Sequence, residues 1–469
     1  MGEADRTIEG WLTKERVATK VRVRFASRFS LWVQADEDHQ DGSLEGEGDL
    51  SLKIAGKVVD LGLCKSFADE GANGDLRRFA PAERLHNFES LFSRSRVEVL
   101  ESSIGNVQLL LGHKEHIDPG LRSFVSDLTY DLNVYKNILD KMDLESRAEP
   151  VTIREHVQAR LLATIGGQLS EYLDEALIRL EGVISSFSES EQENHGYYFR
   201  KQLWSFLLTA PIMARTNLKP RGYSGDSEMM RMIYLNNYMG ESTFGKVLHK
   251  HAVGHAAAQA VRNRRVDIAA MIHRRFDEGK WRRGSPFRVL SVACGPAFEM
   301  RDLVRTASDC EGMHLSLLDQ DQQALMEAGS LVGEIESSFG VKLSVDFIRE
   351  SVRTMLFTPQ LRERWGKFHF IYSMGLFDYL TPPVALAVLR KLYSLLEVGG
   401  EVIVGNFARE NASRTYMEYW LDWKIIHRTT DEFLEMAANL PHVKAEVLFD
   451  ATGIQMFLRA VRQAGDGEN

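Results

Sequence analysis

Cysteine is scarce in this chain, and long apolar runs are absent. Only three cysteines occur among 469 residues, Cys64, Cys294 and Cys310, and they do not have the spacing of metal ligands. We therefore expect a reducing cytoplasm, no disulfide framework and no metal site. No apolar run approaches the roughly 20 residues of a membrane helix. The first ten residues, MGEADRTIEG, have neither a basic start nor an apolar core, so we expect no signal peptide.

An excess of basic charge is also missing. The chain has 57 Lys and Arg against 66 Asp and Glu, which gives a formal net charge of -9. This balance argues against a nucleic-acid backbone as the main partner. The length exceeds what one hydrophobic core usually serves, so we expect two or three domains.

Three stretches of different pattern suggest the domain organisation. Residues 1–118 contain alternating segments such as KVRVRF, LSLKIAGKVVDLG, RVEVLES and NVQLLLG, which predict a small β domain, with a barrel as one arrangement. Residues 119–285 have helical periodicity, interrupted at Pro211 and again between Pro220 and Gly225. In residues 286–469 strand patterns alternate with helices, which predicts a doubly wound, mostly parallel sheet of α/β type. One predicted helix covers residues 384–400, before a strand at 401–407.

The first strand of the third stretch ends in a turn of small residues. The run VLSVACGPAFE places Ala293, Gly295 and Ala297 where a dinucleotide motif would have three glycines, and Asp319 ends the next apolar run. Such a turn lets a ligand approach the backbone, and the acid can accept hydrogen bonds from ribose hydroxyls. The missing glycines favour S-adenosylmethionine (SAM), which has no phosphates. An ordinary connection without ligand remains the alternative, and Asp319 could instead be a helix N-cap or a surface acid.

Two segments of the helical stretch could supply further site residues. The run NLKPRGYSGDSEMM predicts a shaped loop that presents Arg221, Tyr223 and Asp226; alternatively, it is a plain connector in which Asp226 caps the next helix. Further on, Arg264 and Arg265 interrupt an apolar helical stripe. At least one of them should meet a carboxylate, which could belong to the protein, to the methionyl tail of SAM or to an acidic substrate.

These segments carry a resemblance to a known family. The runs PRGYSGDSEMM, AVRNRR and FHFIYSMGLFDYL resemble bacterial methyltransferases that make the methyl ester of 3-hydroxypalmitic acid, a quorum-sensing signal, over roughly residues 105–430. The resemblance implies a class I methyltransferase fold with SAM as cofactor. It also implies a PilZ-like N-terminal domain with a nucleotide ligand, but the PilZ signatures are not matched convincingly, so we expect a regulatory or structural domain.

The resemblance also assigns cofactor contacts. It puts Ala293, Gly295 and Ala297 at the methionyl moiety and Asp319 at the ribose. Beyond these, it puts two residues near the adenine and three beneath the sulfonium: Ser351 and Val352, then Tyr372, Ser373 and Met374.

The expected function is O-methyl transfer to a small-molecule or lipid-like acid. A carboxylate acceptor is ionised at neutral pH and needs no general base, only groups that orient it. The candidates are Arg221, Tyr223, Arg264, Arg265 and Arg428. A hydroxyl acceptor would need a base, for which the candidates are His195, His249, Asp226 and Asp378. The alternatives are a SAM-binding regulatory module without turnover and a hydroxyl, amine or protein acceptor.

Overall fold

The computed structural model describes residues 8–14, 17–26, 31–35, 44–54, 57–67, 76–82, 114–279, 285–358 and 360–465. The chain forms two compact units. One comprises Met1–Ser126 with Val183–Lys201, and the other comprises Asp127–Gly182 with Gln202–Asn469. The domain boundaries at residues 118 and 285 stay predictions. In the described residues, no helix combines the length and apolar character needed to cross a membrane.

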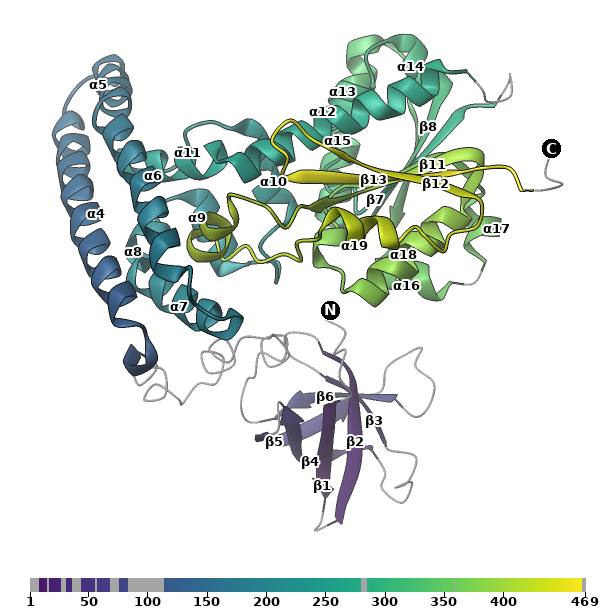
Figure 1. The fold of residues 1–469 in the computed structure, drawn as a ribbon, viewed down its shortest axis with the longest axis horizontal. Helices are drawn as coiled ribbons and strands as arrows, with labels where there is room; N and C mark the ends of the chain where they lie inside the picture. Colours follow the sequence, from purple (N-terminus) through teal and green to yellow (C-terminus); the bar gives the residue numbers. More distant parts are fainter. Residues whose placement is uncertain are drawn as a thin grey trace. The chain divides into compact units, whose positions relative to one another are not determined.

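Six antiparallel strands of the first unit form a closed barrel, drawn in purple in Figure 1. Alternate residues point inward, and the interior contains Leu12, Val21, Val33 and Leu50, all essentially inaccessible to solvent. The predicted β domain is thus confirmed as a barrel, whereas the predicted strands at residues 96–102 and 106–112 lie outside the described residues. Around the barrel the strands follow the order β1 (Ile8–Lys14), β2 (Val17–Ala26), β3 (Leu31–Ala35), β6 (Leu76–Pro81), β5 (Lys57–Phe67) and β4 (Glu47–Ile54).

The middle of the chain is helical, as predicted. Pro211 begins a helix, where its missing N–H costs nothing, and Lys219 ends the same helix in a left-handed conformation. Ser242 caps a later helix through the amide of Gly245. The helices are η1 (Lys114–His116), α4 (Pro119–Ser146), α5 (Val151–Ala163), α6 (Ile165–Ile184), α7 (Glu189–Gln202), α8 (Trp204–Leu207), α9 (Pro211–Leu218), α10 (Ser227–Leu235), α11 (Thr243–Gly254) and α12 (Ala256–Asp277).

The second unit also contains a sheet of seven strands. Its order is β12-β13-β11-β10-β7-β8-β9, and the pairings that link β11, β10, β7, β8 and β9 are parallel. Strand β13 runs antiparallel to both of its neighbours. The strands are β7 (Phe287–Val292), β8 (Met313–Asp319), β9 (Ser344–Arg349), β10 (Phe368–Ser373), β11 (Leu396–Phe407), β12 (Val443–Phe449) and β13 (Gln455–Arg462).

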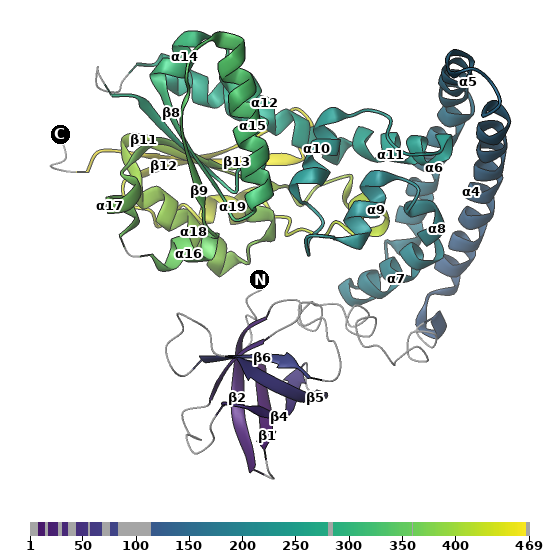
Figure 2. The ribbon, with the colours of Figure 1, turned by 180° about the vertical axis from the view of Figure 1, so that it is seen from behind.

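Helices cover both faces of this sheet (Figures 1 and 2). On β7, Val289 packs into one apolar cluster with residues of α12 and α15, while Leu290 packs into the other with residues of α18. This alternation confirms the predicted doubly wound α/β arrangement. The remaining helices are α13 (Met300–Leu303), α14 (Ala307–Gly312), α15 (Gln322–Phe339), α16 (Val352–Phe357), α17 (Leu361–Trp365), η2 (Phe377–Tyr379), α18 (Pro382–Ser394), a π-helical turn η3 (Tyr416–Trp420) and α19 (Thr430–Glu435).

One predicted boundary was wrong. The helix expected over residues 384–400 ends at Ser394, and β11 begins at Leu396. Leu396 pairs with Phe368 of β10, so pairing with a neighbouring strand overrides the local helical pattern.

Candidate functional site

The parallel order reverses between β7 and β10, because β8 and β9 lie on one side of β7 while β10 and β11 lie on the other. In open α/β sheets, ligands bind beyond the carboxyl ends of the strands at such a switch point. Here that edge carries the turn after β7, Asp319 at the end of β8 and residues 372–374 at the end of β10.

The turn after β7 is held in an unusual backbone conformation. Ala293, Gly295 and Ala297 all have φ near +50°, a region that L-residues adopt rarely. The Cys294 amide donates to the Leu318 carbonyl at 3.0 Å, which ties the turn to β8. A Cβ added at Gly295 would meet no atom within 4 Å. The backbone at Gly295 therefore borders open space in which a ligand could sit.

Asp319 accepts hydrogen bonds from backbone amides. One carboxylate oxygen accepts the Gly295 amide at 2.8 Å, and the other accepts the Asp321 amide at 2.9 Å. Burial raises the pKa of this carboxyl, and the hydrogen bonds from the amides of Asp321 and Gly295 partly oppose that rise. Asp319 is thus fixed beside the turn and keeps lone pairs for a further donor.

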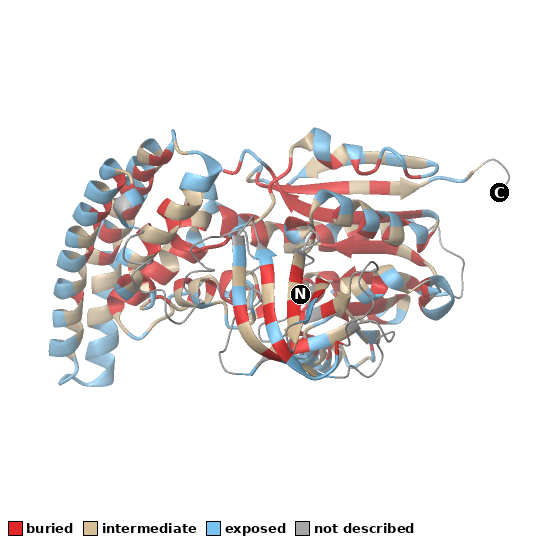
Figure 3. Ribbon diagram, turned by 90° about the horizontal axis from the view of Figure 1, so that it is seen from below, coloured by how far each residue is buried: buried red, intermediate tan, exposed pale blue. Residues whose placement is uncertain are grey.

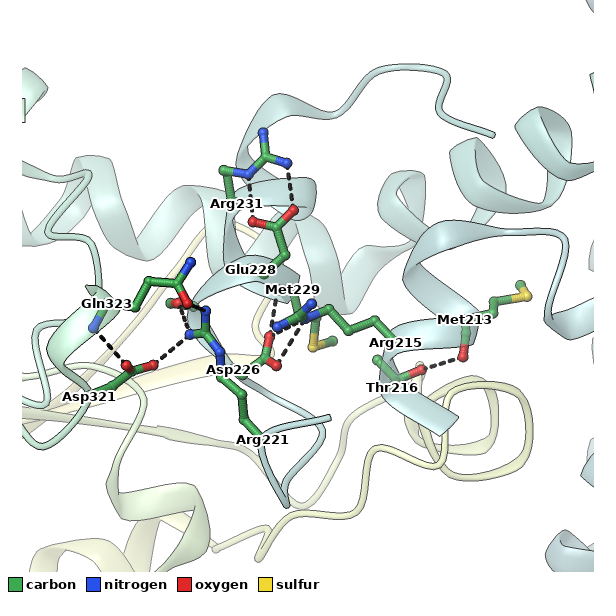
Figure 4. A network of polar contacts seen from close by, with 11 residues as sticks. Met213, Arg215, Thr216, Arg221, Asp226, Glu228, Met229, Arg231, Asp321 and Gln323 are labelled. Atoms are coloured by element: carbon green, nitrogen blue, oxygen red, sulfur yellow. Dashed lines mark hydrogen bonds and ion pairs between the residues drawn. The ribbon is translucent and has the colours of Figure 1, made fainter. Parts of the chain in front are cut away.

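The loop at residues 219–226 reaches the same edge from the helical segment (Figure 4). Arg221 pairs with Asp321 and donates to the Gln323 side chain at 2.8 Å. Asp321 in turn caps α15 by accepting the Gln323 amide at 2.9 Å. The guanidinium of Arg221 therefore joins the loop to the start of α15, two residues beyond Asp319.

Asp226 at the end of this loop is occupied by protein contacts. Its two carboxylate oxygens accept the Arg215 Nε–H at 2.7 and 2.9 Å, and one of them also caps α10 through the Met229 amide (Figure 4). The side chain is fully buried. These contacts match the alternative role as a helix cap, and we leave Asp226 out of the proposed catalytic set.

The other side of the loop meets aromatic residues. The Tyr223 and Tyr379 rings are edge to face with centroids 6.5 Å apart, and the Tyr379 hydroxyl accepts the Trp423 indole N–H at 2.9 Å. A Cβ on Gly225 would lie 2.2 Å from that hydroxyl oxygen, so any larger residue there would displace the Tyr379 side chain. Burial, with help from Asp319 and other nearby carboxylates, raises the pKa of Tyr223 to about 12. Its hydroxyl is therefore a hydrogen-bond donor at neutral pH.

The neighbouring arginines of α12 have different partners. Arg265 forms an ion pair with Asp302 at 2.7 Å, so it meets the structural carboxylate that was one of the expected partners. Arg264 is buried, and its guanidinium donates to the Met374 carbonyl at 3.1 Å and contacts the Met230 sulfur at 3.4 Å. Within the described part of the chain, no carboxylate forms an ion pair with Arg264. Its buried positive charge therefore lies at the end of β10, where it acts to lower the pKa values of the nearby carboxyls of Asp378 and Glu299.

Residues 372–374 alternate across the sheet. The Tyr372 hydroxyl donates to Glu299 at 2.6 Å, and the Ser373 hydroxyl donates to the Val292 carbonyl at 2.8 Å. Both residues are buried. They fix the positions of β10 and the β7 turn, whereas Met374 supplies the carbonyl that Arg264 contacts.

Ser351 and Val352 lie beyond the end of β9. Ser351 caps α16 by accepting the Thr354 amide at 3.0 Å, and Val352 packs against the apolar cluster on the α18 face. Both residues are partly exposed. Their predicted place near an adenine stays a prediction.

The candidate bases are engaged elsewhere or buried. His195 accepts the Asp118 amide at 2.9 Å, and His249 is fully buried with its pKa lowered by burial to about 4. Asp378 accepts the Phe407 amide at 2.8 Å, and burial raises its pKa to about 6. Arg428, a candidate for orienting an acceptor, instead donates to the carbonyls of Phe377 and Leu380.

Glu299 is a site residue that the sequence analysis did not single out. It is buried, burial raises its pKa, and the charges of Arg264 and Arg265 act in the opposite direction. The signal was present in the sequence, because Glu299 is the only charged residue in the run from Val289 to Met300.

Comparison with known families gives no match: no protein-family model and no curated protein matches the chain. Distantly similar solved structures exist. A possible exported protein from Bordetella parapertussis is 17% identical, with 66% of this chain and 97% of that chain covered and a TM-score of 0.42. The SAM-dependent methyltransferase SibL in its apo form is 16% identical, with 76% and 98% covered and a TM-score of 0.35.

A third similar structure is magnesium protoporphyrin IX methyltransferase from Synechocystis with bound SAM. It is 12% identical, with 44% of this chain and 83% of that chain covered and a TM-score of 0.31. The chain's own topology, with five parallel-paired strands and one inserted antiparallel strand, fits the α/β fold of class I methyltransferases.

Proposed function

We propose that this protein is a SAM-dependent O-methyltransferase that esterifies the carboxylate of a small or lipid-like acid, with a 3-hydroxy fatty acid as the best candidate. One observation carries the proposal. The turn after β7, the carboxylate of Asp319 and the buried guanidinium of Arg264 converge on the carboxyl edge of β7, β8 and β10.

The turn and Asp319 support the cofactor. The open space at Gly295 suits a ligand that touches the backbone, and the fixed carboxylate of Asp319 suits the two hydroxyls of a ribose. The turn is shaped by positive φ angles at Ala293, Gly295 and Ala297, and it lacks the three glycines of a dinucleotide site. SAM meets both requirements, since it carries a ribose and no phosphate.

Arg264 supports an acidic acceptor. A buried guanidinium is costly unless an anion compensates it. Arg264 contacts a carbonyl, a sulfur and Tyr234, and no carboxylate among the described residues lies within ion-pair distance of it, although its charge acts on Asp378 and Glu299. Arg221 and Arg265 already have carboxylate partners. Because Arg264 contacts Met374, which the resemblance puts beneath the sulfonium, a carboxylate bound to it would lie near the transferred methyl group.

The chemistry that these residues must supply is modest. SAM supplies the electrophilic methyl group, and an ionised carboxylate attacks it in line without a base. Arg264 would hold one carboxylate oxygen and leave the other free to attack. Tyr223, protonated at neutral pH, could donate a second orienting hydrogen bond. The candidate bases His195 and Asp378 accept backbone amides, and His249 is buried with a lowered pKa. This favours a carboxylate acceptor, which needs no base, over a hydroxyl acceptor.

A pair of matched acceptors tests the reaction. The protein is incubated with methyl-labelled SAM and either 3-hydroxypalmitic acid or its methyl ester, in which only the hydroxyl is free. We expect label in the acid alone, released as methanol by mild base. Labelling of the ester or of the protein would reject the carboxylate acceptor. SAM binding without any labelled product would instead favour the regulatory module.

Two neighbouring arginines provide the test of the site. Arg264→Ala should lower kcat/KM for the acid by about 100-fold, because a charged hydrogen-bonding partner of the acceptor is lost, while SAM affinity stays the same. Arg265→Ala is the matched control and should leave kcat/KM nearly unchanged. If Arg264→Ala weakened SAM binding and did not change the KM for the acid, Arg264 would bind the methionyl carboxylate of SAM instead.

We further propose that the protein works in the cytoplasm, as its cysteines suggest. Cys64, Cys294 and Cys310 are all buried free thiols, which suits a reducing compartment. For the barrel we propose a regulatory or structural role.

A further inference from the structure

Helix α4 has an exposed face that is partly apolar. Leu128, Leu132 and Leu139 are buried on its inner side. On its outer side, at the left of Figure 3, exposed residues follow the whole helix. Leu144, near the C-terminal end of the helix, is 62% exposed. Three further large apolar side chains on the outer side have exposed fractions of 71%, 44% and 43%, namely Tyr130, Val134 and Ile138.

These apolar residues belong to a stripe with charged ends. Asp127, Val134 and Lys141 are each seven residues apart, so they lie on one line along the helix, with Tyr130 and Ile138 beside it. Asp127 and Lys141 are both exposed. We call these five residues the α4 stripe. Lys141 also lies 3.8 Å from Glu145, in an exposed pair that contributes little.

The α4 stripe is symmetric about Val134. Tyr130 and Ile138 stand four residues before and after it, and Asp127 and Lys141 stand seven residues before and after it. The two ends carry opposite charges. When two such helices pack antiparallel with Val134 at the centre, each Asp127 lies opposite a Lys141 and each Tyr130 lies opposite an Ile138. A two-fold axis requires this kind of self-complementary surface.

We propose that the α4 stripe is a homodimer interface, and that its occupant is the same stripe of a second copy of this chain. The charge pattern selects the antiparallel arrangement, because parallel helices in register would place Asp127 against Asp127 and Lys141 against Lys141. The apolar centre supplies the buried area, and the two ion pairs set the register. This interface is independent of the methyltransferase site.

Charge reversal on the full-length protein tests the pairing by sedimentation equilibrium. The wild-type chain should dimerise. Asp127→Lys and Lys141→Asp should each weaken the dimer about tenfold or more, because two attractive pairs become repulsive. The double variant Asp127→Lys/Lys141→Asp should restore the affinity. Asn133→Lys, which adds a charge on α4 outside the stripe, is the matched control and should have no such effect.

Val134→Glu gives the stronger perturbation, with an expected loss of about 100-fold in affinity, since two carboxylates would meet at the axis. Circular dichroism checks that each variant stays folded. A monomeric wild-type chain at tens of micromolar would overturn the proposal. A dimer that both single charge reversals leave intact, or that the double reversal fails to restore, would do so as well.

Discussion

The carboxylates around the strand ends fall into two groups that differ in their partners. Two acids hold the loop at residues 219–226, and we call them the loop-side acids: Asp226 pairs with Arg215, and Asp321, at the start of α15, pairs with Arg221. On the sheet side, Asp319 and Asp378 accept backbone amides, and burial raises the pKa of each. The loop-side acids are compensated and hold the loop in place. The burial of the sheet-side acids is only partly offset by backbone hydrogen bonds and, for Asp378, by the charges of Arg264 and Arg428, and carboxyls perturbed in this way are frequent at functional sites.

The largest expected effect concerns the loop-side pair of Arg215 and Asp226. Arg215→Ala leaves a fully buried carboxylate without its cation, so we expect a loss of roughly 3–5 kcal/mol in the free energy of unfolding. Urea denaturation measures this loss. Arg215→Ala combined with Asp226→Asn should recover much of it, because asparagine can still cap α10. An equal loss in the double variant would show that the contribution of Arg215 is not electrostatic.

Asp378 should give the next largest effect. Burial raises the folded-state pKa of Asp378 to about 6, above its ordinary value of 3.8, so the folded protein binds this proton more tightly than the unfolded chain. Its contribution to stability therefore falls as the pH rises from about 4 to about 6, by roughly 3 kcal/mol in total.

Asp378→Asn should remove this pH dependence while still accepting the Phe407 amide. Urea denaturation at several values between pH 4 and 7 measures the difference between the two proteins. His249 acts in the opposite sense, since its lowered pKa costs stability as the pH falls from 6.5 towards 4. The comparison must therefore be made against wild type at each pH. If the difference in the free energy of unfolding between wild type and Asp378→Asn stayed constant from pH 4 to 7, the assignment to Asp378 would be contradicted.

Asp319→Ala should weaken SAM binding about 100-fold, because hydrogen bonds to a charged acceptor are lost. Stability should change less than in Arg215→Ala, since no cation in the part of the chain that the structure describes forms an ion pair with Asp319. Calorimetry measures the affinity, and Asp319→Asn should be intermediate. Unchanged SAM binding in Asp319→Ala would remove this acid from the proposed cofactor site.

The smallest effect is expected for the half-buried pair of Arg221 and Asp321. Arg221→Ala should cost about 1 kcal/mol in stability, because both side chains are only partly buried. Arg231→Ala is the matched control, since its partner Glu228 lies on the same helix and does not tie the loop to the sheet. Limited proteolysis should cut residues 219–226 faster in Arg221→Ala than in the control. Equal cleavage rates would mean that the loop is held by its aromatic side.

Local patterns predicted the sheet and the turn well. Apolar runs and small residues between 287 and 319 specify β7, its turn and β8. Both signals are local, because each lies within a few consecutive residues of the sequence. The start of β11 was missed because pairing between strands decided it.

Side-chain partners could not be predicted in the same way. Arg264 and Arg265 are adjacent in the sequence, yet only Arg265 meets Asp302, 37 residues away. Likewise, Arg221 pairs with Asp321, which lies one hundred positions further along the chain. Such pairs depend on how whole elements pack, which single-residue patterns do not record.

The position of β13 has a consequence for how the chain folds during synthesis. This strand is the last of the seven in the sequence, yet it lies between β11 and β12. Until residues 455–462 leave the ribosome, β11 has an open edge and β12 has no neighbour in the sheet. The sheet is therefore completed only after its six other strands have been made, and the exposed edge of β11 is a place where a chain stalled or truncated before β13 would aggregate.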